Sequence, residues 1–129
     1  MARAYTVATV AVALTVERKW VDNVLTHYQL PDVPRRTQGV SRRLSSNAVL
    51  VLRVALSLTE DLGVPISRSI NLAKKLVDAR GVLVEQGISV SFDFDAFEKL
   101  VHDRLAAAVE VAPVPLRGRP PQNKTGRLD

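Results

Sequence analysis

The chain has 129 residues, of which 47% are hydrophobic and only 5% are aromatic, and its net charge is +5. This length fits one domain with one core, packed mainly by aliphatic side chains. The absence of cysteine excludes disulfides and thiolate metal sites and fits a reducing cytoplasm. The N-terminal apolar run, residues 4–16, is too short to span a bilayer and is followed by no small-residue cleavage pattern. We therefore expect a cytoplasmic protein that does not enter a membrane.

The charge is unevenly distributed along the chain. Residues 1–44 hold seven bases and three acids, a net charge of +4, and residues 45–80 have a net charge of +2. Residues 81–111 hold two bases and six acids, a net charge of −4, and the segment from residue 112 onward is basic again, at +3. One part of the fold is thus suited to a polyanion, whereas the acidic part is not.

Apolar residues at helical spacing predict two short helices near the N-terminus. Thr6 is a candidate N-cap for the first helix, which ends near Leu14. A tight break at residues 15–16 leads into a second helix over about residues 17–28, and Pro31 prevents its continuation. The pattern therefore predicts two consecutive helices joined by a short turn.

An arginine-rich segment, residues 31–43, follows the second helix. It contains two prolines, one glycine and four arginines in 13 residues, so we expect a loop or a short hairpin rather than a helix. Ser45 or Ser46 then caps a third helix that runs to about Leu62. Gly63 ends this helix because glycine readily adopts the left-handed conformation that helix C-termini use.

The region after Gly63 predicts one further helix and then a change to strand periodicity. Ser67 is a plausible cap for a fourth helix that extends to about Ala79. Two short apolar stretches, Val82–Glu85 and Ile88–Phe92, flank a Gln-Gly pair, which is typical of a β-hairpin. We therefore expect a hairpin directly after the fourth helix.

The last predicted helix is acidic and amphipathic. Asp93 or Asp95 caps it, and it runs to about Val111. The side chains expected to point inward are Phe97, Leu100, Val101, Leu105 and Ala108. Residues 113–129 are rich in proline and basic residues and predict a disordered tail.

Groups suited to catalysis or metal binding are few. His27 and His102 both lack a second histidine at metal-ligand spacing; His27 fits a helix end, and His102 lies on the acidic helix facing solvent. Asp93 and Asp95 resemble a catalytic carboxylate pair, but a helix-capping role explains both residues without a catalytic function. The sequence contains no glycine-rich dinucleotide motif, phosphate-binding lysine loop or nucleophile elbow. We therefore expect neither an enzyme nor a bound cofactor or metal.

The order of these elements suggests binding to double-stranded DNA. The predicted order is a helix, a tight turn, a second helix and an arginine-rich loop. In such an arrangement the second helix can enter a major groove of DNA while the loop reaches the neighbouring phosphates. Arginine and lysine attract phosphates, and asparagine can pair with an adenine edge. RNA binding has less support, because no aromatic stacking surface is evident in the sequence.

Three stretches together resemble the MerR-type winged helix-turn-helix family. "TVATVAVALTVERKWVDNVL" resembles its two-helix reader, "RRTQGVSRRLSSNAVLVL" its wing and third helix, and "LTEDLGVPISRSINLAKKL" its second helix pair. The resemblance covers about residues 5–78. It implies a mainly α fold with small β-hairpins, in which residues 1–80 form a winged helix-turn-helix. Residues 81–112, the hairpin and acidic helix, then form a dimerisation or partner surface, and residues 113–129 form the tail.

The resemblance also implies which residues meet DNA. On the second helix these are Glu17, Arg18, Lys19, Asp22 and Asn23, and on the wing they are Arg35, Arg36, Arg42 and Arg43. Trp20 is added to the predicted DNA contacts because its ring could stack on sugar or phosphate. Three features depart from the family: Thr15 replaces a frequent glycine in the turn, Trp20 is unusually large, and the aromatic-arginine pair of the reader is missing.

Several of these residues have a second interpretation. Arg18 and Lys19 could form an ordinary solvated face, and tryptophan is more often a core or interface anchor than a DNA contact. Asp22 repels phosphate, so we expect it to orient Arg18 or Lys19, or to accept from a cytosine amine.

Taken together, these features predict a homodimeric, sequence-specific DNA-binding repressor. The long antiparallel helix through which such regulators dimerise is missing, so the dimer must form in another way. The alternative is an antitoxin or another adaptor that binds a partner protein through its C-terminal part. About 30 residues there are too few for an enclosed small-molecule pocket.

Overall fold

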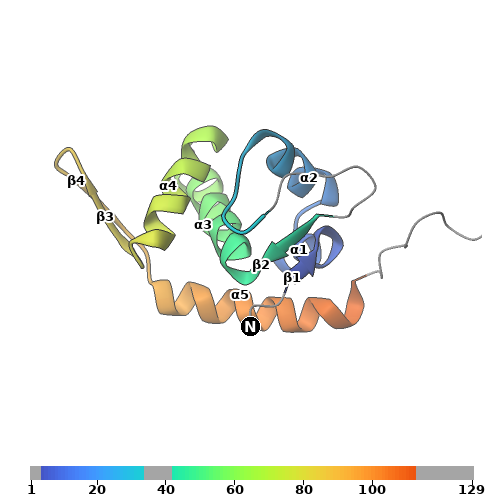
Figure 1. The fold of residues 1–129 in the computed structure, drawn as a ribbon. Coiled ribbons are helices and arrows are strands. Elements are labelled where there is room, and N and C mark those ends of the chain that lie inside the picture. The colour runs from blue at the N-terminus through green and yellow to red at the C-terminus, as the bar shows by residue number, and fades with distance from the viewer. Residues whose placement is uncertain (1–3, 34–41, 113–129) are drawn as a thin grey trace, which may run out of the picture.

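The computed structural model describes residues 4–33 and 42–112. In this part the chain is mainly helical, with five α-helices and two small antiparallel sheets (Figure 1), which confirms the predicted mainly α class. The elements in chain order are β1 (Ala4–Thr6), α1 (Val7–Leu14), α2 (Arg18–His27), β2 (Arg43–Ser45), α3 (Ser46–Leu62), α4 (Ile66–Asp78), β3 (Val82–Glu85), β4 (Ile88–Ser91) and α5 (Phe94–Val111).

The first two helices form as their local signals predict. Thr6 is the N-cap of α1, and its hydroxyl accepts a hydrogen bond from the backbone N–H of Thr9 at 3.1 Å. Thr15 ends α1 in the left-handed conformation, with φ 59° and ψ 47°, and turns the chain toward α2. Helix α2 buries Val21 and Val24 and leaves most of its polar residues exposed.

The first sheet joins the N-terminus to the strand that precedes α3. Strand β1 pairs antiparallel with β2, and Tyr5 lies opposite Leu44, which is completely buried. The sequence suggested a loop or a hairpin within residues 31–43, and it did not predict that the N-terminus would supply the partner strand. Residues 34–41, which would form most of that loop, lie outside the described residues.

Helices α3 and α4 pack against each other and hold much of the core. Ser45 caps α3 through a 3.1 Å bond from the backbone N–H of Ala48, and Gly63 ends it with φ 70°. The prediction that Ser67 caps α4 is wrong. The N-cap is Pro65, Ser67 lies inside the first turn, and no side chain caps this end. Proline already fixes the extended φ that an N-cap needs.

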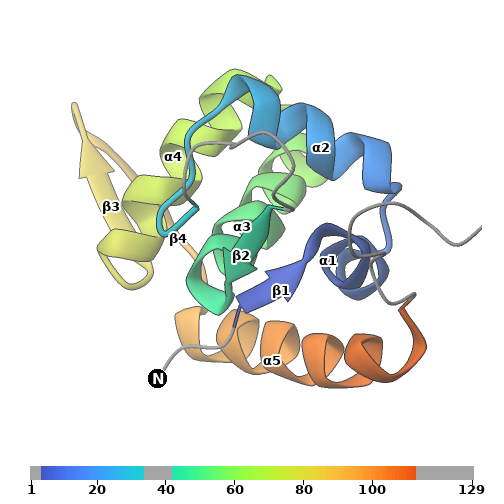
Figure 2. The same cartoon turned by 45° about the vertical axis from the view of Figure 1, so that its right-hand side comes forward.

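The second sheet is the predicted hairpin, which projects beyond α4 and away from the other helices (Figures 1 and 2). Gly81 connects α4 to it with φ +116°, and a Cβ added there would lie 2.9 Å from the carbonyl oxygen of Phe92. Only glycine fits this close approach without strain. The carboxylate of Asp93 caps the next helix, α5, by accepting a hydrogen bond from the backbone N–H of Ala96 at 3.0 Å. Of the two predicted candidates, the N-cap is therefore Asp93 and not Asp95.

Helix α5 lies along α1 and α3 and shares their core. Val101, Leu105 and Ala108 are buried there, as predicted. Leu100 was also expected to point inward, but it is 36% exposed, because it lies at the edge of the buried stripe beside a surface hollow. The core is thus continuous from α1 to α5.

Candidate nucleic-acid interface

Helix α2 has one buried face and one open polar face. Val21 is completely buried and Val24 nearly so, and they hold the helix against the core. The residues predicted to meet DNA that are exposed on or next to α2 are Glu17, Arg18, Lys19, Asp22 and Asn23. Glu17 precedes the helix, and the others lie within its first six residues, which span about 9 Å. The polar face is therefore accessible along the N-terminal part of the helix.

Two bases occupy the first turn of α2, where they do not stabilise the helix. Arg18 and Lys19 are its first two residues, this turn contains no acidic residue, and Glu17 makes no capping hydrogen bond with its side chain. The N-terminal end of a helix carries a partial positive charge, so cations in the first turn are unfavourable by a few tenths of a kcal/mol or more. Basic residues here work against helix stability and favour a phosphate instead.

Neither base has an acidic partner in the part of the chain that the structure describes. The ion pairs recorded there are Lys75 with Glu85, at 2.8 Å, and Lys99 with Asp103, at 3.1 Å. Asp22 was expected to orient Arg18 or Lys19, but the structure records no such pair. Instead its backbone carbonyl accepts from the Thr26 hydroxyl at 2.8 Å.

The described arginines of the predicted wing lie beside this helix or on the adjoining strand. The Nη1 atom of Arg42 donates to the backbone carbonyl of Asp22 at 3.2 Å, and both terminal nitrogens lie 3.4 Å from the Thr26 hydroxyl. Arg43 is the exposed first residue of β2. Arg35 and Arg36 lie outside the described residues. The structure therefore places one predicted wing arginine directly on the outer side of α2.

Trp20 lies between the two faces of α2. It is partly buried, packs against the core, and lines an open depression of about 360 Å³ with Asn23, Val24, His27, Tyr28 and Ile66. This position agrees with the interpretation of Trp20 as an anchor. Its indole is still accessible from the depression, which lies next to Asn23 on the polar face.

The two histidines occupy ordinary helix positions. His27 is the last residue of α2, with Nδ1 2.9 Å from the Asn23 carbonyl oxygen, and His102 is exposed on α5, as predicted. Within residues 4–33 and 42–112, no three His, Cys, Asp or Glu side chains gather where they could hold a metal ion. None of the described helices has the length and apolar character needed to cross a membrane.

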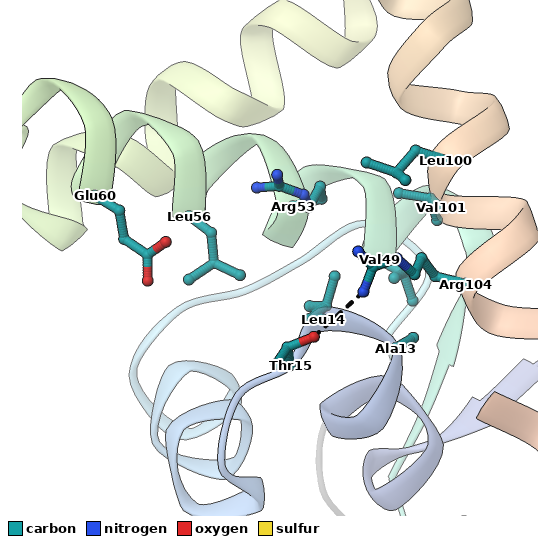
Figure 3. A pocket seen from close by; sticks show the side chains of 10 residues that line it. All are labelled: Ala13, Leu14, Thr15, Val49, Arg53, Leu56, Glu60, Leu100, Val101 and Arg104. Atoms are coloured by element: carbon teal, nitrogen blue, oxygen red, sulfur yellow. Dashed lines mark hydrogen bonds between the residues drawn. The ribbon is translucent and has the colours of Figure 1, made fainter. Parts of the chain in front are cut away.

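Two surface features were missed by the sequence analysis. One is a hollow bordered by α1, α3 and α5, where Arg104 donates to the Thr15 hydroxyl at 3.3 Å (Figure 3). The other is the apolar surface of the predicted hairpin, on which Val82, Val84 and Ile88 are 57%, 65% and 68% exposed. Strand alternation could have identified Val82 and Val84, which lie on the face opposite Leu83, but not Ile88, which pairs with Glu85 beside the turn and lies on the Leu83 face. No local pattern indicates the hollow.

Comparison of the chain with protein-family models, with curated proteins and with solved structures finds no match.

Proposed function

We propose that the chain is a sequence-specific double-stranded DNA-binding repressor that inserts α2 into the major groove. The main support is the open first turn of α2, where Arg18 and Lys19 have no acidic partner in the described part of the chain. Asn23 follows on the exposed side and offers an amide that can pair with adenine. Arginine and lysine supply affinity through phosphates, and asparagine adds discrimination between bases.

The turn before α2 and the segment after it complete this proposal. Helix α1 packs against α2 and the core, so it would hold the recognition helix at a defined angle. Arg42 and Arg43 carry positive charge beside α2 and on β2. In this arrangement they contact the phosphates that flank the groove, which is the role that the MerR-like wing would have.

Binding of the full chain to duplex DNA tests this function. We expect submicromolar binding to a fragment from the region upstream of its own gene at about 50 mM salt, measured by fluorescence anisotropy. Four phosphate contacts per copy, or eight in a homodimer, give a logarithmic salt slope of about −7, so binding should weaken by roughly four orders of magnitude between about 50 and about 200 mM salt. Failure to bind any duplex at low salt, or equal affinity for unrelated duplexes, would contradict a sequence-specific function.

A homodimer is part of the proposal, because two recognition helices about one helical turn apart double the available contacts. The exposed hairpin residues Val82 and Val84 lie on one face of β3 and are candidates for this contact. The exposure of these two apolar side chains also favours a second function, in which the hairpin binds a different protein and the chain acts as an antitoxin or adaptor. Large exposed apolar side chains on a projecting element are typical of protein contacts.

The variant Val82→Ser/Val84→Ser separates these two functions. For a homodimer, sedimentation should show a dimer of the purified wild-type chain and a monomer of the variant. For an adaptor, the wild-type chain alone should be a monomer, and a protein that co-purifies with it from the native cell should be lost with the variant. If neither self-association nor a co-purifying protein depends on the two valines, the hairpin has neither role.

A further inference from the structure

A hollow of about 330 Å³ lies between the C-terminal end of α1, one face of α3 and the middle of α5 (Figure 3). This volume is at the lower end of the range for small-molecule sites, about 300 to 1,000 Å³. The site takes its walls from three helices. Residues 81–111 alone were expected to be too few for an enclosed small-molecule pocket. That expectation does not apply to this hollow, because α1 and α3 also line it.

Arg53 enters the hollow from α3 and is held there by neutral groups. Its Nη1 donates to the Ser57 hydroxyl at 2.8 Å, one turn further along the helix, and its guanidinium lies 5.5 Å from the centre of the Phe97 ring. The side chain is partly buried, so its charge is less well solvated than that of a surface arginine. It makes no ion pair with a described residue.

Arg104 approaches the same hollow from α5. Its Nη1 donates to the Thr15 hydroxyl at 3.3 Å, and it likewise has no acidic partner in the described part of the chain. The one carboxylate among the lining residues is that of Glu60. Glu60 is seven residues after Arg53 on α3, or about 10 Å along the helix axis, and forms an ion pair with neither arginine. The hollow therefore combines two guanidinium groups that have no ion-pair partner among residues 4–33 and 42–112.

The rest of the lining is mainly aliphatic. Leu14 comes from α1, Leu56 from α3 and the partly exposed Leu100 from α5. A carboxylate is the natural partner of a guanidinium, and a small hydrocarbon or aromatic body would cover these leucines. We infer that the hollow is a binding site for a small organic carboxylate whose head lies between Arg53 and Arg104. This inference does not depend on DNA binding.

Titration of the full ¹⁵N-labelled chain with benzoate and hexanoate, each against its uncharged amide, tests the site by NMR. Both carboxylates should shift the Thr15 and Leu100 backbone amides and the Arg53 and Arg104 side-chain Nε–H signals in a saturable way. The amides should bind at least about tenfold more weakly, because they cannot form the charge-assisted pairs.

Two single variants and one control complete the experiment. Arg53→Gln and Arg104→Gln should each weaken carboxylate binding by about tenfold or more, while Lys99→Gln, which removes an exposed α5 charge that does not line the hollow, should leave it unchanged. Unchanged spectra outside the hollow would verify that the variants are folded. The inference is overturned if neither carboxylate saturates, if carboxylates and amides bind equally, or if binding survives both arginine substitutions.

Discussion

A variant with both Arg18 and Lys19 replaced by alanine is expected to bind its DNA site at least about a thousandfold more weakly than the wild-type chain. Each contact of this kind contributes about 1 to 3 kcal/mol, and a homodimer would lose four of them. The two residues have no ion pair with a described residue, so the substitution breaks none that the structure records. The measurement is fluorescence anisotropy with the same duplex, repeated over a series of salt concentrations.

The salt dependence shows which contacts were lost. If both residues contact phosphates, the logarithmic salt slope of a bound homodimer should become shallower by about 4; if one of them contacts a base, it should change by about 2. Asn23→Ala should instead relax the preference between sequences and leave the slope unchanged, because a neutral amide releases no counterion.

A control for the single variant Arg18→Ala keeps the loss of one positive charge constant. Lys99→Ala also removes one base, but from α5, which lies on the other side of the helices from α2 in both views (Figures 1 and 2). It should change DNA affinity by less than about threefold at about 100 mM salt, where exposed charges beyond about 10 Å are largely screened. If Lys99→Ala weakens binding as much as Arg18→Ala alone, net charge rather than the face of α2 would account for the binding.

Replacing Leu105 by alanine is expected to lower the free energy of unfolding by about 2 to 5 kcal/mol. Leu105 on α5 is completely buried in the shared core, so truncation removes apolar contacts and leaves a cavity. Such a loss is a large fraction of the stability of a small domain, about 5 to 15 kcal/mol. Urea denaturation followed by circular dichroism measures it.

Leu100 on the same helix is the control for this prediction. It is 36% exposed, so Leu100→Ala should cost no more than about half as much as Leu105→Ala. Similar small effects at both positions would mean that α5 is not packed on α1 and α3 in solution. A large loss at Leu105 alone would support one cooperative unit from α1 to α5.

The helices were largely predictable because their signals are local. Thr6, Ser45 and Asp93 cap helices through bonds to a backbone N–H three residues ahead, and such spacing is evident in the sequence. The error at Ser67 has the same origin. A serine before an apolar stripe resembles a cap, but Pro65 was already suited to start the helix.

The site was only partly predictable. The exposed residues of α2 followed from its apolar stripe, because residues opposite buried valines must face outward. The position of Arg42 against Asp22 and Thr26 did not follow, since it joins residues that are 20 and 16 positions apart along the chain. The role of Thr15 was also missed. Its hydroxyl accepts from Arg104, which gives this turn residue a partner that glycine would lack.

The sequence by itself determined the number of helices, most of their bounds, the hairpin after Gly81, and the polar face of α2. These features depend on caps, turns and periodicity within a few residues. Only the tertiary structure decided that β1 pairs with β2, that α5 completes the core, and that Arg53 and Arg104 share a hollow. Such contacts join distant segments, Thr15 and Arg104 being 89 residues apart, and local patterns do not specify which segments meet.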